Sequence, residues 1–219
     1  MSKSKDKEWI SLLRNIENQV SRLLWNRYLF REFMATIETN SALDTNNPFV
    51  VWVWENYLFN AALGVRRLID RDRRSISLLL LLEDIAKKPE ILSRKRYAAL
   101  FEDSGLSDDT AYINRCFDSL VGEGKDCPDR RDIEHNMQKL LIIAKILIRY
   151  VNKMVAHIDK GTIRKLPTIN DLDASIDCLA DITKKYYAIL HAGGVELLPV
   201  AQTPWKRIFE IPWISSRGR

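Results

Sequence analysis

The sequence has little glycine and little cysteine. The first shortage argues against β-hairpins, and the second argues against disulfide-rich and zinc-binding proteins. It contains 8 glycines in 219 residues and no Asn-Gly or Asp-Gly pair, so β-hairpins lack their strongest turn signal. Its three cysteines form neither a C-x-x-C pair nor a cluster with histidine; they are Cys116, Cys127 and Cys178. These shortages disfavour a disulfide framework and a zinc site, and they favour reduced thiols in the cytoplasm.

Long uninterrupted apolar runs are missing as well. The apolar stretch 48–65 is broken by Glu55, Asn56 and Asn60, and an unpaired glutamate inside a bilayer is costly. We therefore predict no membrane span and interpret this stretch as a buried core helix. The charged N-terminus lacks the apolar region of a secretory signal, which also predicts a cytoplasmic protein.

The composition is that of an ordinary globular domain. Hydrophobic residues make up 46% and charged residues 29% of the chain, which is too apolar for intrinsic disorder. We predict a single domain over residues 1–219. The net charge of +5 favours contact with polyanions such as nucleic acid, although basic runs such as 71–74 and 94–96 are more often solvated helix faces and loops.

Apolar residues recur at every third and fourth position almost throughout, which predicts an all-α fold. In the first half of the chain, helices are expected at residues 9–37, from Phe49 to about Leu68 after Asn47-Pro48, and from Ile76 to about Ala86 after a Ser75 cap. Two shorter helices are expected to begin at Pro89 and at residues 107–109. In the second half, a long helix is expected from Pro128 to His157, and a last one from the capping motif at residues 168–171 to just before Gly193. The first, second, long and last helices would form an antiparallel bundle. Residues 75–120 would be an insertion of shorter helices, and residues 193–219 an irregular tail.

Polar side chains are concentrated near the end of the long predicted helix. Arg149, Lys153 and His157 are spaced by four and would share one helix face, with Asn152 one position round. Histidine can take a proton from a ribose hydroxyl near neutral pH, and the other groups can donate hydrogen bonds to phosphoryl oxygens. Such chemistry requires neither a metal nor another cofactor. The stripe therefore predicts a phosphodiester site, whereas the alternative is that His157 only bonds free carbonyls at a helix end.

Several segments occur in a distinctive order: Trp54 to Leu82 with Arg67-Leu68-Ile69-Asp70 and Ser75-Ile76-Ser77-Leu78, then residues 152–159, Pro167-Thr168, Trp205 and Pro212-Trp213. This order resembles the HEPN superfamily of helical ribonucleases, and within it the AbiU-like branch associated with abortive phage infection. The resemblance implies a HEPN-like helical bundle and a homodimer whose two motifs face a shared cleft. It also implies an RNA substrate and a defence-system partner such as an antitoxin.

The sequence departs from the HEPN motif at one position. The motif places an arginine, often followed by a polar residue, four to six residues before the histidine. His157 and Asn152 match the histidine and the polar residue, so Val151 stands where the arginine belongs. Valine cannot hydrogen-bond a phosphate. Either Arg149, Lys153 or an arginine from across a dimer interface supplies the charge, or the site is impaired or inactive.

Two functions follow from this departure. The first is a metal-independent endoribonuclease of a phage-defence or toxin–antitoxin system, leaving a cyclic phosphate. In it His157 is the base or acid, Asn152 and Lys153 contact the phosphate, and Arg149 replaces the missing charge. The alternative is a non-catalytic helical scaffold that binds RNA or a protein partner, which the valine at position 151 favours.

Other polar and aromatic residues are candidates for supporting roles. Glu55 and Asn56 would be expensive to bury in an apolar helix without partners, so they face a cleft or join a polar network. The tryptophans could stack on bases, although core or tail packing is the commoner use of such residues; they are Trp52, Trp54, Trp205 and Trp213.

A further group of charged residues lies on either side of the predicted site in sequence. Arg66 and Asp70, with Arg67 between them, have the i,i+4 spacing of an ion pair, which is more often a surface feature than a ligand site. Asp159 could cap the helix, pair with Lys153 or orient His157.

Overall fold

The computed structural model describes residues 2–102, 109–155, 166–201 and 203–211, and within them every regular element is helical. This confirms the all-α prediction. The α-helices are α1 (Ser2–Thr39), α2 (Pro48–Leu68), α3 (Leu78–Lys87), α4 (Arg94–Glu102), α5 (Thr110–Val121), α6 (Arg130–Ile143), α7 (Lys145–Tyr150) and α8 (Ile169–His191). Short 3-10 turns lie at Pro89–Leu92 and Trp205–Phe209, and a π-helical segment spans Val151–Val155.

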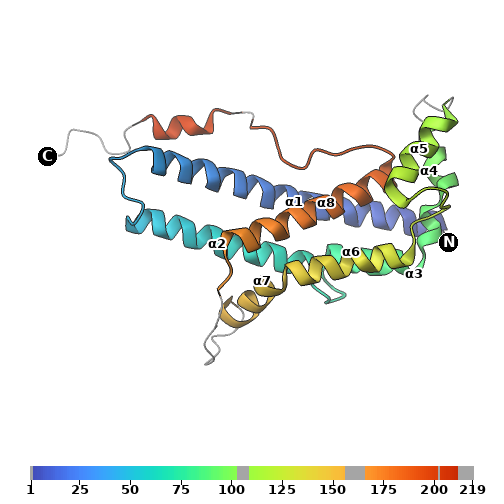
Figure 1. Ribbon diagram of the computed structural model, residues 1–219, viewed down its shortest axis with the longest axis horizontal. Helices are drawn as coiled ribbons and strands as arrows, with labels where there is room; N and C mark the ends of the chain where they lie inside the picture. Colours follow the sequence, from blue (N-terminus) through green and yellow to red (C-terminus); the bar gives the residue numbers. More distant parts are fainter. Residues whose placement is uncertain (1, 103–108, 156–165, 202, 212–219) are drawn as a thin grey trace.

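The long helices pack as an antiparallel bundle. Helix α1 contacts both α2 and α8, while α6 contacts α3 and α8 (Figure 1). Because α1 is amphipathic, it turns a fully buried stripe toward these neighbours; the stripe is Trp9, Leu13, Ile16 and Val20. Gly64 lets α1 come close to α2, since a Cβ there would lie 2.7 Å from Leu23 Cδ2.

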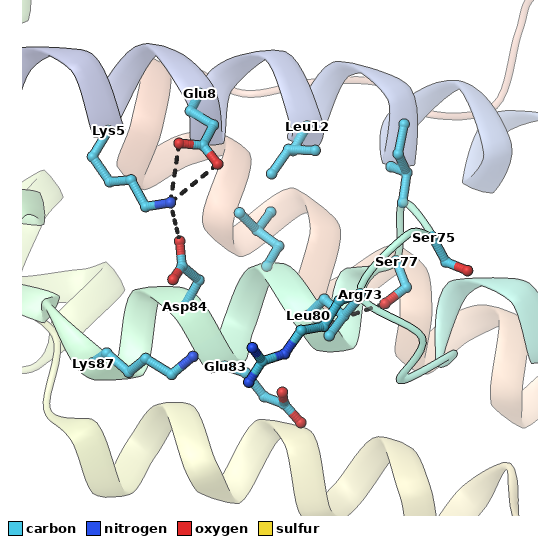
Figure 2. A pocket seen from close by; sticks show the side chains of 12 residues that line it. Lys5, Glu8, Leu12, Arg73, Ser75, Ser77, Leu80, Glu83, Asp84 and Lys87 are labelled. Carbon is cyan, nitrogen blue, oxygen red and sulfur yellow. Dashed lines mark hydrogen bonds and ion pairs between the residues drawn. The ribbon is translucent and has the colours of Figure 1, made fainter.

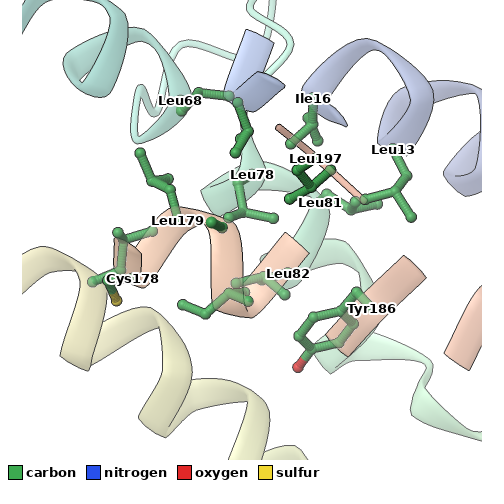
Figure 3. Packing of buried hydrophobic residues seen from close by; sticks show 14 of the residues in the cluster. Leu13, Ile16, Leu68, Leu78, Leu81, Leu82, Cys178, Leu179, Tyr186 and Leu197 are labelled. Carbon is green, nitrogen blue, oxygen red and sulfur yellow. The ribbon is translucent and has the colours of Figure 1, made fainter. Parts of the chain in front are cut away.

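Helix α3 belongs to this core although it is only 10 residues long. Leu78, Leu79, Leu82 and Ile85 are all 0% exposed. Figure 3 shows leucines of α3 meeting side chains of α1, α2 and α8, and each fully buried leucine contributes about 2 kcal/mol by leaving water. Residues 75–120 therefore include one helix of the central packing as well as α4 and most of α5.

The helix ends follow local sequence signals in most cases. Asn47 Oδ1 accepts a hydrogen bond of 2.9 Å from the Phe49 N–H, with Pro48 as the first residue of α2. Thr168 and Asp171 form the predicted capping box of α8. The Ser75 cap was wrong, because the N-cap of α3 is Ser77, whose Oγ accepts from the Leu80 N–H.

The basic run 94–96 has a structural use that the sequence did not indicate. Arg96 donates to the carbonyls of Ile189 and Leu190 at 3.1 and 2.8 Å, where α8 leaves its last carbonyls without intrahelical partners. Arg94 donates to Asp118 and to the Lys125 carbonyl, and its guanidinium lies 4.8 Å from the centre of the Phe117 ring. Both arginines therefore hold helices together, so this run does not provide a free cationic surface.

The residues after α8 return along α1 (Figure 1). In the 3-10 turn, Trp205 meets Tyr28 edge to face with ring centres 6.1 Å apart, and Phe209 lies 6.1 Å from Phe33. Lys206 forms an ion pair with Glu32. This part of the tail therefore covers the side of α1 that faces away from α2.

Candidate functional site

The predicted long helix from Pro128 to His157 is not one regular helix. Helix α6 begins at Arg130 after an Asp129 cap and ends at Ile143, and α7 begins at Lys145. The chain then becomes π-helical over Val151–Val155. A π-helix bonds each residue to the fifth along instead of the fourth, so the spacing of four that aligned Arg149 with Lys153 does not hold here. Short π-helical insertions are frequently found at functional sites.

The π-helical segment is held against α2 through Asn152. Arg66 Nε donates a hydrogen bond of 3.2 Å to Asn152 Oδ1, and Arg66 Nη1 lies 3.2 Å from Asp70 Oδ1. The second contact confirms the predicted i,i+4 pair. The first was missed, because it joins residues 86 positions apart and depends on α2 packing against the π-helical segment. The only sequence signal was the arginine itself.

The Arg66 guanidinium has capacity for a further ligand. These two contacts engage two of its five N–H donors. Burial disfavours the ionised form of Asp70, but the Asp72 backbone N–H and the Arg66 guanidinium outweigh this and lower the pKa of the Asp70 carboxyl. Asp70 therefore stays ionised and fixes the orientation of Arg66. An arginine held in this way can bind phosphate oxygens with its remaining donors.

The other predicted site residues have different surroundings. Val151 is 3% exposed and belongs to the hydrophobic core, so it contributes no polar group. Arg149 is exposed on α7, and Lys153 is half-buried in the π-helical segment. Arg67 is exposed, and its carbonyl accepts a hydrogen bond from the Asp70 N–H in the backbone turn at the end of α2. His157 and Asp159 lie outside the described residues.

A cavity of about 580 Å³ lies beside the same part of the fold, between α2, α7 and residues 166–167. It is lined by Trp54, Glu55, Asn56, Phe59, Tyr150 and Pro167, among others. Glu55 and Asn56 thus face a cavity, one of the two surroundings predicted for them. The interpretation of residues 48–65 as a buried core helix holds for one face, where Leu58, Ala61 and Val65 are buried. The other face is open, because Phe49, Trp52 and Phe59 are 48%, 58% and 40% exposed.

A second cavity, of about 390 Å³, lies between α1, α3 and the connection from α2 to α3 (Figure 2). Its charges neutralise one another. Lys5 Nζ lies 2.8 Å from Asp84 Oδ2 and 3.0 Å from Glu8 Oε2, and the Trp9 indole donates to Asp84 at 2.8 Å. This arrangement ties α1 to α3 and explains the polar lining as a structural feature.

The described segments hold neither a cluster of metal-binding side chains nor a helix that could cross a membrane. Among these residues, no group of three or more histidine, cysteine, aspartate or glutamate side chains could hold a metal ion. None of the helices in the described part of the chain is both long enough and apolar enough to cross a bilayer.

Comparison with known protein families identifies the family of this chain. Neither the curated proteins nor the solved structures include a match to this chain. Among protein families, residues 6–208 match the AbiU2 family of HEPN proteins, a range that includes the first seven helices, the π-helical segment, α8 and most of the last 3-10 turn. Because this match extends over nearly the whole chain, the protein belongs to the HEPN AbiU2 family.

Proposed function

We propose that this chain is a metal-independent endoribonuclease of an abortive-infection system, in which Arg66 supplies the guanidinium that Val151 cannot. One observation carries the proposal: Arg66 Nε donates to Asn152 Oδ1 at 3.2 Å. Asn152 stands at the polar position of the HEPN motif. An arginine from α2 therefore reaches the residue next to the position where the motif arginine is missing.

The proposed reaction is transesterification at an RNA phosphate. The His157 imidazole takes the proton from a ribose 2′-hydroxyl, and the 2′-oxygen attacks the adjacent phosphorus. The bond from phosphorus to the 5′-oxygen breaks, and that oxygen receives the proton. The products are a 2′,3′-cyclic phosphate and a 5′-hydroxyl end. Arg66 and Lys153 stabilise the negative charge that builds on the phosphoryl oxygens, and Asp70 positions Arg66.

Replacing His157 with alanine tests this chemistry. We expect the wild type to cut structured or unstructured RNA in the presence of a chelator, and we expect His157→Ala to cut about 10²-fold to 10⁴-fold more slowly, the usual contribution of a general acid or base. Gel analysis with end-specific labelling would report both the rate and the cyclic phosphate. His135→Ala is the matched control, because His135 is exposed on α6. Equal cutting by wild type and His157→Ala, or no cutting by either, contradicts the proposal.

One observation favours the non-catalytic alternative. Val151 is 3% exposed within the core, so the chain has adapted to an apolar residue where the motif has a cation. In that case the wild type would bind RNA or a protein partner without cutting RNA. The cleavage assay separates the two functions, since only the ribonuclease produces a cyclic phosphate.

We also propose that the chain forms a homodimer through the start of α2. Phe49, Val51 and Trp52 are 48%, 42% and 58% exposed, and residues 48–54 carry no charge. Exposed apolar surface of this kind marks an interaction site. Two copies of a chain with net charge +5 repel each other, but an uncharged apolar surface lets them meet without pairing like charges.

Replacing Trp52 with glutamate tests the dimer. We expect light scattering after size exclusion to give twice the chain mass for the wild type and the single-chain mass for Trp52→Glu, because the new carboxylate would be buried without a partner. Val200→Glu is the control, since Val200 is 83% exposed in the tail and should leave the mass unchanged. A monomeric wild type, or equal masses for wild type and Trp52→Glu, contradicts this interface.

A further inference from the structure

The cavity of about 580 Å³ between α2 and α7 offers flat aromatic surfaces to a ligand. Trp54, Phe59 and Tyr150 line it, and Trp54 and Phe59 remain 37% and 40% exposed. Unstacked RNA bases bind to such rings, because every base has a π-face that can stack on them. The size is also within the usual range for small-molecule pockets.

The strongest polar group of this cavity is a hydrogen-bond acceptor. Among the described residues that line the cavity, Glu55 alone carries a charge, and an ionised carboxylate only accepts. Asn56 Nδ2 donates one of its two N–H groups to the Trp52 carbonyl at 2.8 Å, and its Oδ1 adds a second acceptor beside Glu55. A carboxylate repels phosphate, so the matching group is uncharged and presents donors. Among the bases, guanine presents two adjacent donors, N1–H and N2–H, to a single carboxylate.

The cavity and the Arg66–Asn152 contact lie along one side of α2. Asn56, Phe59, Leu63 and Arg66 are spaced by three, four and three, so they share a helix face, and α2 packs against both α7 and the π-helical segment. Glu55 and Arg66 are about three helical turns apart, about 16 Å along the axis. On the other side, Tyr150 precedes Asn152 by two residues. Neighbouring nucleotides of one strand can therefore reach both places.

We propose that this cavity binds a guanine base of single-stranded RNA, with Trp54 as the stacking surface and Glu55 as the acceptor for the base edge. The inference deepens the proposed function and rests on it, because it takes the ligand to be the RNA whose phosphate binds at Arg66. It assigns base preference to α2 and α7, several residues away from the reacting groups.

Binding of RNAs that cannot be cleaved tests this assignment. The probes are 2′-O-methyl hexamers of uridine that contain one guanosine, one inosine or one adenosine, and anisotropy titration measures their affinities. We expect the wild type to bind the guanosine hexamer about ten-fold more tightly than the adenosine hexamer, as for one bidentate contact to a base. The inosine hexamer, whose base lacks the N2 donor, should bind with an affinity between those of the other two.

Three variants separate the contribution of the Glu55 carboxylate from that of stacking on Trp54. Glu55→Gln should bind guanosine and adenosine hexamers equally, whereas Glu123→Gln, which removes the same charge from an exposed loop residue, should keep the wild-type preference. Trp54→Ala should weaken all three hexamers by a similar factor of about ten through lost stacking. Circular dichroism of each variant checks that the helices are retained.

The inference is overturned if the wild type shows no guanosine preference, if Glu55→Gln keeps that preference, or if no hexamer binds. It is also overturned if Trp54→Ala leaves RNA binding intact and instead abolishes self-association, since the cavity would then be an interface between copies. Because these RNAs cannot be cut, a guanosine preference that depends on Glu55 stands even where ordinary RNA is not cleaved. A guanosine preference without cleavage of ordinary RNA would therefore contradict the proposed ribonuclease activity but not the guanine site.

Discussion

Replacing Arg66 with glutamine is expected to lower kcat for RNA cleavage by about 10²-fold to 10³-fold, the usual cost of removing one donor that stabilises a developing oxyanion. The guanidinium lies beside Asn152 and is oriented by Asp70 at 3.2 Å. Glutamine keeps much of the side-chain length but loses the charge and the fork of donors. Initial rates on a labelled RNA at saturating concentration would measure the effect.

Two comparisons make the Arg66 result specific. Arg66→Lys keeps the charge without the planar fork and should recover only part of the activity. Arg14→Gln removes the same charge from an exposed position on α1 and should cut at the wild-type rate. Unfolding is not expected to explain the loss, because a partly exposed pair such as Arg66–Asp70 contributes well under about 1 kcal/mol. If Arg66→Gln cuts normally while Arg149→Gln does not, the cation of the site is Arg149.

Replacing Trp9 with alanine is expected to lower the free energy of unfolding by about 3–5 kcal/mol, the usual cost of truncating a buried aromatic side chain. Trp9 is 0% exposed, and its indole N–H donates to Asp84 Oδ2 at 2.8 Å (the Asp84 carboxylate is shown in Figure 2). The substitution leaves a cavity between α1 and α3 and removes one donor from a carboxylate. Urea unfolding followed by circular dichroism would measure it.

Trp9→Phe separates packing from hydrogen bonding. Phenylalanine fills most of the space but cannot donate to Asp84, so we expect a smaller loss of about 1–2 kcal/mol. Lys5 still pairs with Asp84 at 2.8 Å in that variant. A Trp9→Ala protein as stable as the wild type would show that the α1–α3 contact is not part of the cooperative core.

Local signals predicted those features of the fold that depend on few residues. The Asn47 cap with Pro48, and the Thr168–Asp171 capping box, are each complete within about four residues, and both were confirmed. Ser75 and Ser77 are both acceptable caps by type. The choice between them is made by burial, because starting α3 after Ser77 puts Leu78 and Leu79 in the core and leaves Ile76 41% exposed.

The features that sequence reasoning missed depend on packing between distant segments. No local pattern distinguishes the π-helical segment 151–155 from an α-helix, since its residues are compatible with both. Arg66 reaches Asn152 only because α2 packs against that segment. Likewise, the aromatic residues at the start of α2 looked like core residues, but the bundle has too few neighbouring helices there to cover Trp52.

The candidate site was therefore predicted in part. Asn152 and Lys153 were predicted from residue type and motif position, and the Arg66–Asp70 pair from its spacing, yet no sequence pattern linked these two groups to one another. The assignments of His157 and Asp159 remain predictions, because both residues lie outside the described part of the chain. The structure adds the Arg66 guanidinium to the site, because α2 places it next to Asn152.

The packing of α8 on α1 has a consequence for how the chain folds during synthesis. Arg27 of α1 donates to the Asp173 carbonyl of α8 at 3.4 Å, a contact that spans 146 residues. Helix α1 therefore leaves the ribosome well before α8, which later packs against its apolar stripe. Contacts of such long range slow folding, and the exposed stripe meanwhile is a target for chaperones or for aggregation. Nascent chains that stop before Ile169 should therefore remain protease-sensitive along α1, and protection should appear only once α8 has emerged.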